Sequence, residues 1–121
     1  MLNKEKVYNI TPVPKPRMTQ ADRWKQRPSV MRYWAYKDEV KALKIECLPG
    51  DEITFILPMA KSWSKKKKVE FDNTPHLLKP DFDNLLKALW DSVHDDDQHL
   101  WCIGESKKLW GYEGKIIITR K

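Results

Sequence analysis

The strongest constraint on the fold lies in the stretch FDNLLKALWDSV, residues 82–93, where apolar side chains recur with helical spacing. They fall at i, i+3, i+4, i+7, i+8 and i+11, namely Phe82, Leu85, Leu86, Leu89, Trp90 and Val93. This spacing places them on one stripe of an α-helix, and so large a stripe must be covered by other elements. We therefore predict an amphipathic helix whose apolar face packs against the core of a globular domain.

The polar face of the same helix carries charged residues at helical spacing. At roughly 100° per residue, Asp83, Lys87 and Asp91 fall together opposite the apolar stripe, with Asn84 beside them. Lys87 is therefore predicted to lie between two carboxylates, each four residues away. An exposed, salt-bridged face would have the same pattern and would contribute only tenths of a kcal/mol. The spacing alone leaves both interpretations open.

Asp81 comes two residues before Asp83, and its position decides whether the two carboxylates can meet on one ion. On a continuous helix they would point roughly 200° apart. We predict that the helix begins after Asp81, because proline favours helix starts and Pro80 comes just before it. Capping of the helix is an ordinary alternative role for either aspartate.

A second acidic group, the run Asp95–Asp97, follows the helix pattern. Three adjacent carboxylates repel one another, so a solvated loop is one interpretation. The other is that one of them joins Asp81 and Asp83 around Mg²⁺ or Mn²⁺, hard cations that prefer oxygen ligands. The segment lacks the glycine and the final glutamate of an EF-hand loop, which argues against a calcium sensor.

Carboxylates and a hard cation within a basic protein are a recurring arrangement for phosphodiester hydrolysis. The cation lowers the pKa of bound water and neutralises charge that develops on the scissile phosphate. Lys87 would add a positive hydrogen-bond donor to the same phosphate. These residues therefore lead to the hypothesis of a metal-dependent nuclease.

The charge balance also indicates a polyanionic partner. The formal net charge is +6, and clustered Lys and Arg bind phosphate backbones, although a merely soluble basic surface would have the same charge. We predict an irregular basic arm over residues 12–30 and a basic loop over residues 60–73. The residues predicted to contact DNA are Lys15, Arg17, Arg23, Lys25, Arg27, Lys61, Lys65, Lys66, Lys67, Lys68 and Lys79. Candidates for stacking on opened bases, or for a dimer interface, are Trp24, Trp63, Trp101 and Trp110.

The rest of the chain predicts a mixture of strands and helix. Segments rich in β-branched residues and bounded by Pro or Gly predict strands at residues 7–11, 51–59, 100–106 and 115–119. The turn-rich sequence KKLWGYEG joins the last two. A helix over residues 29–44 is predicted with Ser29 as its N-cap. Its predicted buried face comprises Val30, Tyr33, Trp34, Tyr36, Val40 and Leu43.

Length and composition bound the remaining possibilities. The 121 residues predict a single domain, residues 1–121. No stretch approaches the roughly 18 apolar residues of a membrane span, and the first residues lack an apolar signal core. We therefore expect a cytoplasmic protein with no membrane partner and no small-molecule substrate. Cys47 and Cys102 belong to no CxxC motif, so neither a disulfide framework nor a zinc ribbon is indicated.

Four segments together are similar to a known family. KPDFDNLLKALWD followed by DDDQ, and preceded by PVPKPR and SWSKKKK, resembles the RusA family of Holliday junction resolvases, often encoded in phages and prophages. The resemblance covers most of the chain. It implies an α+β fold, a small mixed sheet packed against two main helices, in a homodimer. It also implies an endonuclease of DNA recombination and repair that binds four-way junctions and makes paired, symmetric nicks with Mg²⁺ or Mn²⁺.

The resemblance also assigns site residues. The two aspartates of the DxDN motif correspond to Asp81 and Asp83, and the later acidic residue corresponds to Asp96. These three are the implied catalytic and metal-binding carboxylates, and the motif lysine corresponds to Lys87. The acidic run begins sooner after the helix than the family pattern leads us to expect, so Asp95 stays an alternative to Asp96.

Two other classes of function remain open. A non-catalytic nucleic-acid-binding module would use its aspartates only to cap a helix and solvate a loop, and replacing Asp83 with Asn would leave its function intact. A metal-dependent nuclease acting on flaps, nicks or RNA would differ only in substrate. A panel of labelled substrates separates this second class from a junction resolvase.

Overall fold

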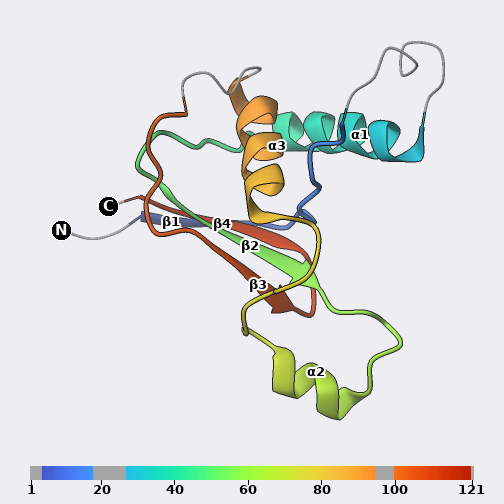
Figure 1. The fold of residues 1–121 in the computed structure, drawn as a ribbon. Helices are drawn as coiled ribbons and strands as arrows, with labels where there is room; N and C mark the ends of the chain where they lie inside the picture. Colours follow the sequence, from blue (N-terminus) through green and yellow to red (C-terminus); the bar gives the residue numbers. More distant parts are fainter. Residues whose placement is uncertain (1–3, 18–26, 95–99, 121) are drawn as a thin grey trace.

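The computed structural model describes residues 4–17, 27–94 and 100–120, and these form strands and helices in mixed order. The elements are β1 (Lys4–Tyr8), α1 (Pro28–Ala42), β2 (Glu52–Pro58), α2 (Lys65–Phe71), α3 (Phe82–His94), β3 (Lys107–Gly111) and β4 (Lys115–Arg120) (Figure 1). The strands make one sheet in the order β1-β4-β2-β3. β3 runs parallel to β2, and the other pairs are antiparallel. The predicted α+β class with a small mixed sheet is therefore confirmed.

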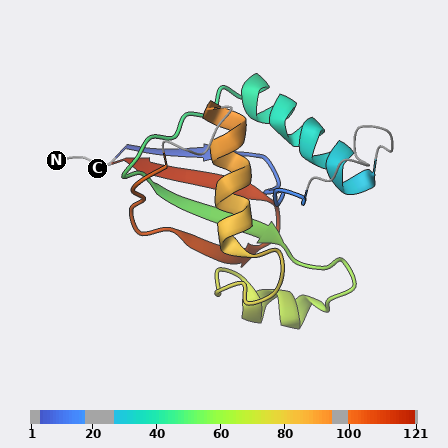
Figure 2. The same ribbon diagram turned by 45° about the horizontal axis from the view of Figure 1, so that its top comes forward.

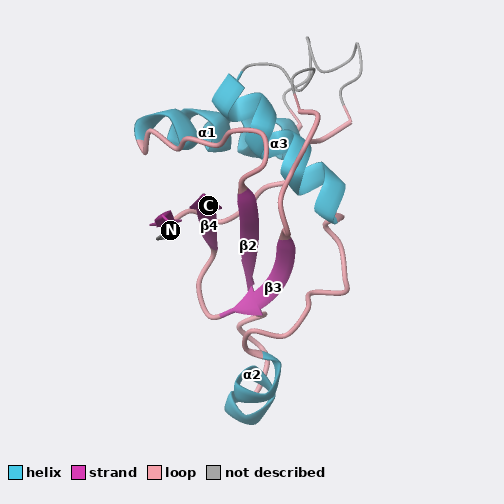
Figure 3. Cartoon of the chain, turned by 90° about the vertical axis from the view of Figure 1, so that its left-hand side faces the viewer, coloured by secondary structure: helices cyan, strands magenta, loops and turns pink. Residues whose placement is uncertain are grey.

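The helices divide into two groups by position. α3 lies across one face of the sheet and packs against α1 (Figure 2). α2 lies apart from them, beyond the ends of β2 and β3 (Figure 3). Two main helices therefore accompany the sheet, while the third forms a small projection. No helix in the described ranges is long and apolar enough to cross a membrane.

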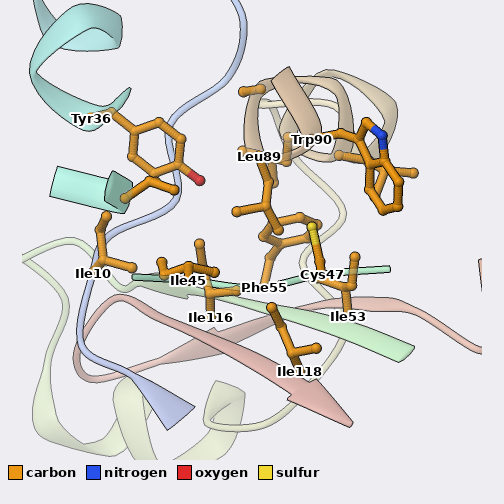
Figure 4. Close-up of a cluster of buried hydrophobic side chains, with 14 of the residues drawn as sticks. Ile10, Tyr36, Ile45, Cys47, Ile53, Phe55, Leu89, Trp90, Ile116 and Ile118 are labelled. Carbon is orange, nitrogen blue, oxygen red and sulfur yellow. The ribbon is translucent and has the colours of Figure 1, made fainter. Parts of the chain in front are cut away.

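The core lies between α3 and the sheet. Leu89 and Trp90 of α3 face Ile53, Phe55 and Ile116 of the strands, and all five side chains are buried (Figure 4). Burial of one such side chain stabilises the fold by roughly 1.5–3 kcal/mol. The predicted stripe is confirmed, since four of its members are buried and the two at its ends, Phe82 and Val93, are partly buried. α3 is thus firmly fixed on the sheet.

α1 begins and ends slightly before its predicted limits. Arg27 occupies the N-cap position without a side-chain cap, and Pro28 begins the helix, so the predicted capping role of Ser29 is wrong. Proline suits this first position because its missing N–H would have no helical partner there. The buried face consists of Val30, Tyr33, Tyr36 and Val40. The predicted burial of Trp34 and Leu43 is wrong, because Trp34 lies about 100° from Tyr33 around the helix and Leu43 follows its last residue.

Residues 65–71 form a helix where a loop was predicted. The hydroxyl oxygen of Ser64 accepts a hydrogen bond from the Lys67 backbone N–H at 3.2 Å and so caps α2. Serine is a favourable N-cap, and lysine is a good helix former. These two local signals favour a short helix, so the predicted loop over residues 60–73 is wrong for residues 65–71.

Two strands lie elsewhere than predicted. β3 occupies residues 107–111, inside the segment predicted to be a turn, while residues 100–106 form no strand. Parallel pairing with the central strand β2 determines this position, and it buries Trp110. β1 likewise lies earlier than the predicted residues 7–11, because it pairs along β4, with Tyr8 opposite Ile116. Neither long-range pairing leaves a local signal.

The turn before β2 is held by a buried carboxylate. Asp51 accepts two hydrogen bonds from Arg120, both at 2.9 Å, and one from the backbone N–H of Leu48 at 2.8 Å. Nearby, a Cβ on Gly104 would lie 2.8 Å from the backbone oxygen of Gly50, so only glycine fits there. These contacts join β4, the turn before β2 and the segment that leads to β3.

Candidate active site

Asp81 and Asp83 lie at the N-terminal end of α3. The helix begins at Phe82, and the backbone oxygen of Asp81 accepts the hydrogen bond from the N–H of Leu85 at 3.2 Å. The prediction that Asp81 precedes the helix is therefore confirmed. Both aspartates are exposed, and the helix dipole favours negative charge at this end. The two carboxylates therefore face solvent at the positive end of the helix dipole.

Lys87 is the basic residue of this end of α3. Its ammonium nitrogen lies 3.9 Å from a carboxylate oxygen of Asp83, and half of its side chain is exposed. So long and exposed an ion pair is worth little. Lys87 is therefore free to turn toward an incoming anion at small cost.

Asp91 does not pair with Lys87 as predicted. Its carboxylate accepts hydrogen bonds from the ammonium of Lys15 at 2.9 Å and from the hydroxyl of Tyr33 at 3.0 Å. Burial raises the pKa of Asp91, but the hydrogen bonds from Lys15 and Tyr33, with the nearby charge of Lys37, bring it below its ordinary value. The negative charge of Asp91 is therefore balanced by partners within the fold.

The same contact fixes the first described part of the basic arm. The backbone N–H of Lys15 also donates to the backbone oxygen of Asn84 at 3.2 Å, so the arm runs along the polar face of α3. The guanidinium of Arg27 donates to the backbone oxygen of Arg17 at 2.7 Å and so joins the two described parts of the arm. Arg17 and Arg27 are exposed, while the charge of Lys15 is engaged by Asp91.

Lys108 is a residue of this site that the sequence did not indicate. It lies on β3, and its ammonium donates to the backbone oxygens of Leu78 at 2.6 Å and Pro80 at 2.7 Å. The peptide bond between Lys79 and Pro80 is cis. Lys108 thereby ties the loop that ends at Asp81 to the sheet. A contact between residues 28 positions apart in the chain leaves no local signal, so only the fold reveals it.

The other predicted DNA contacts gather around α2. Lys61, Lys65, Lys66, Lys67 and Lys79 are exposed and Lys68 is half-buried. Of the predicted exposed tryptophans, Trp101 is exposed and Trp63 is half-buried, while Trp110 is buried. Arg23, Trp24 and Lys25 lie outside the described residues. The basic projection therefore stands beside the loop that leads to the two aspartates.

The third predicted carboxylate lies outside the described residues, as does the whole run Asp95–Asp97. Within the described ranges, no three His, Cys, Asp or Glu side chains lie close enough together to hold a metal ion. Asp81 and Asp83 are thus the described members of the predicted ligand set. Burial raises the pKa of the Cys47 thiol to about 12, which favours its protonated form.

Comparison with known proteins identifies the family. The sequence model of the endodeoxyribonuclease RusA family matches residues 9–119. The chain belongs to the RusA family. A search of curated proteins found no match. The motif around Asp81 and Asp83, the helix α3 and the strands β2 and β3 all fall within the matched residues. The protein is thus a member of a nuclease family that acts on branched DNA, as its sequence predicted.

Proposed function

We propose that the protein is a metal-dependent endonuclease that resolves four-way DNA junctions by paired, symmetric nicks. Membership of the RusA family supports the reaction and the substrate. The observation that carries the proposal is the N-terminal end of α3, where two exposed carboxylates and one weakly paired lysine stand together. Such a group is suited to a cation and a phosphate.

The donor set fits a hard divalent cation. Asp81 and Asp83 offer solvent-facing carboxylate oxygens, the ligands that Mg²⁺ and Mn²⁺ prefer. When bound, such an ion lowers the pKa of water and neutralises charge on the phosphate and the leaving oxygen. Lys87 would donate to a phosphate oxygen, at the cost of only a weak ion pair with Asp83. Lys108 would hold the loop that presents Asp81.

Asp96 is the proposed third ligand, and the geometry of α3 makes this the most demanding part of the proposal. Asp81 and Asp83 stand at one end of the 13-residue helix, and the acidic run follows its other end. At about 1.5 Å per residue these ends are roughly 18 Å apart. Asp96 comes two residues after His94, a span of at most about 7 Å, so coordination of one ion by all three requires that the second copy of the proposed homodimer supplies Asp96 or that the last turns of α3 unwind.

A homodimer follows from the proposed substrate. A four-way junction has two-fold character, and paired nicks at symmetric positions need two sites related by the same axis. One chain carries one DxDN motif, so a second copy would supply the other site. The basic residues of the arm and of α2 would hold the junction arms by phosphate contacts.

The test is cleavage of a synthetic four-way junction, a matched linear duplex, a flap and an RNA hairpin, each in Mg²⁺, in Mn²⁺ and in EDTA. We expect paired nicks at symmetric positions in the junction, none in EDTA, and little cleavage of the other substrates. Equal cleavage of flaps or RNA would contradict the substrate assignment. Tight junction binding without cleavage in either metal would instead indicate a binding module.

The ligand set is tested in the same assay with three matched variants. Asp96→Asn is expected to abolish nicking, while Asp95→Asn and Asp97→Asn are expected to retain it. If Asp95→Asn is the inactive variant, the third ligand is Asp95. If all three variants cut normally, the acidic run is only a solvated segment and the site uses other ligands.

A further inference from the structure

A groove opens between α2 and the loop that leads to Asp81. Its volume is about 250 Å³, and the aromatic part of its lining, referred to below as its floor, comprises Trp63, Phe71 and Trp110. Pockets for whole small-molecule ligands usually have about 300–1,000 Å³. The groove is therefore suited to a single flat group rather than to a large ligand.

The aromatic floor is fixed before any ligand arrives. The ring of Trp63 lies 4.8 Å from that of Trp110 and 5.4 Å from that of Phe71, measured between ring centres. Trp110 is anchored in β3, and its backbone N–H donates to the oxygen of Thr74 at 2.9 Å. Because the rings already pack against one another, binding of a planar group on them would require little further ordering of side chains.

One wall of the groove is apolar and exposed. Leu77 and Leu78 line it, and their exposed fractions are 85% and 61%. Single exposed leucines are ordinary, but two adjacent ones that continue an aromatic floor form an apolar surface with no cover among the described residues. Such a surface is stabilised by a partner that brings its own flat apolar face.

The charge around the groove favours a nucleic acid over a second copy of the chain. The ammonium of Lys67 lies 4.0 Å from the ring centre of Trp63, and the neighbouring Lys65 and Lys66 are exposed on α2. The lysine thereby adds positive charge to a stacking ring. A second copy docked at this groove would bring its own exposed lysines against these, whereas a nucleotide offers a base to the floor and a phosphate to the lysines.

The groove also adjoins the candidate active site. Leu78 comes three residues before Asp81, a span of at most about 11 Å. Lys108 binds the backbone oxygens of Leu78 and Pro80 together, so the wall of the groove and the start of the motif move as one unit. A strand with a phosphate at Asp81 would have nearby nucleotides over the groove, within about three base steps.

We infer that the groove binds one unpaired base of branched DNA, close to the phosphate that is cut. The inference rests on the proposed function and adds a recognition element to it. Bases at a branch point lose stacking partners, and the floor of Trp63 and Phe71 with the leucine wall would replace them. Continuous duplex has no free base to offer, so the groove would distinguish branched from linear DNA.

Binding is measured in EDTA, where no cutting occurs, to a duplex, to the same duplex with unpaired thymines at its centre, and to a four-way junction. The variant is Leu77→Ser with Leu78→Ser, and the control is Val69→Ser, which is 70% exposed on α2 but does not line the groove. We expect the double variant to bind the junction and the unpaired site about tenfold more weakly. Its duplex binding should stay unchanged, as should all binding by the control.

A second measurement locates the base directly. A 5-iodouracil placed at successive nucleotides beside the branch is irradiated with the wild-type protein, and crosslinked peptides are sequenced. Crosslinks to Trp63 or Phe71 from one position support the inference. Crosslinks only to other residues overturn it. So does an equal weakening of duplex binding and junction binding in the double variant. A change in the oligomeric state of that variant would instead make the groove a contact between copies of the chain.

Failure of this inference and failure of the proposed function give different results. If the wild-type protein nicks junctions symmetrically and the double variant binds every DNA like the control, only the groove assignment falls. If the wild-type protein cuts no branched DNA but loses selective binding in the double variant, the groove assignment stands and the nuclease proposal falls.

Discussion

The two ends of the polar face of α3 carry the same residue type in different states. Asp83 is 68% exposed, and its ion-pair partner Lys87 is 3.9 Å away. Asp91 is 15% exposed and is bound by Lys15 and Tyr33 at about 3 Å. By helical spacing alone, both aspartates belong to one charged stripe. They differ because of tertiary contacts: the arm and α1 cover Asp91, whereas Asp83 lies open to a ligand.

The largest effect is expected from Asp83→Asn. The substitution keeps the shape of the side chain and removes one anionic ligand, so nicking of junctions should fall about a thousandfold, the upper end of the cost of losing one preorganised charged group. The free energy of unfolding and junction binding in EDTA should change little, because Asp83 is 68% exposed and its ion pair with Lys87 is long. A variant that still cuts would remove Asp83 from the site.

Lys87→Met tests the same end of the helix from the basic side. Nicking should fall about a hundredfold, because a donor to the phosphate is lost. Urea unfolding should stay within about 0.5 kcal/mol of wild type, since exposed pairs at such distances contribute little. An equal loss of stability and activity would show that Lys87 supports the fold rather than the phosphate.

Local sequence patterns were sufficient to predict α3 and the position of Asp81 at the start of the candidate site. The 3.6-residue period of the stripe and the proline before Asp81 both act within one or two turns of chain. They fixed the apolar face of the helix and the place of Asp81 before it, and both are confirmed. The resemblance to the family motif added that Lys87 corresponds to the lysine of that motif.

The features that the sequence did not reveal depend on contacts between distant segments. β3 lies in a turn-like stretch because β2 offers it a partner. Asp91 was assigned to Lys87, four residues away, but its real partner Lys15 is on the arm. Lys108 reaches the loop before Asp81 only because β3 places it there. In each case the competing partner is remote in sequence, so no local rule can rank it.

A smaller effect is expected from Lys108→Met. This change removes the hydrogen bonds that hold the loop before Asp81, and it alters no proposed metal ligand. Residues that orient metal ligands typically affect metal affinity by about 10–100-fold, and for this variant we expect about tenfold. The Mg²⁺ dependence of nicking should shift to higher concentration, and direct Mn²⁺ binding should weaken equally. Lys108→Arg, which keeps donors for the two backbone oxygens, should recover part of the loss.

That prediction distinguishes positioning from a general loss of folding. At saturating Mg²⁺ the rate of Lys108→Met should approach that of wild type, and junction binding in EDTA should be unchanged. A variant with normal metal affinity but slow cleavage at every Mg²⁺ concentration would contradict the positioning role.

The smallest effect on nicking is expected from Asp91→Asn, whose cost falls on stability and which separates the two ends of α3 most directly. Its hydrogen bonds from Lys15 and Tyr33 are charge-assisted, so urea unfolding at neutral pH should show a loss of about 1.5–3 kcal/mol. The pKa of Asp91 is lowered in the folded state. Its contribution is therefore present above the unfolded pKa of about 3.9 and is lost as the pH falls through the folded value.

The difference in stability between wild type and Asp91→Asn should consequently shrink below about pH 4, and the exposed Asp83→Asn is measured in parallel as the control. A gap that stays constant down to strong acid would mean that Asp91 acts through packing rather than through its charge. A pH-dependent gap for Asp83→Asn as well would mean that the open carboxylate also has a partner in the fold. Either result would remove the distinction between Asp83, as a carboxylate available to a ligand, and Asp91, as a carboxylate whose charge stabilises the fold.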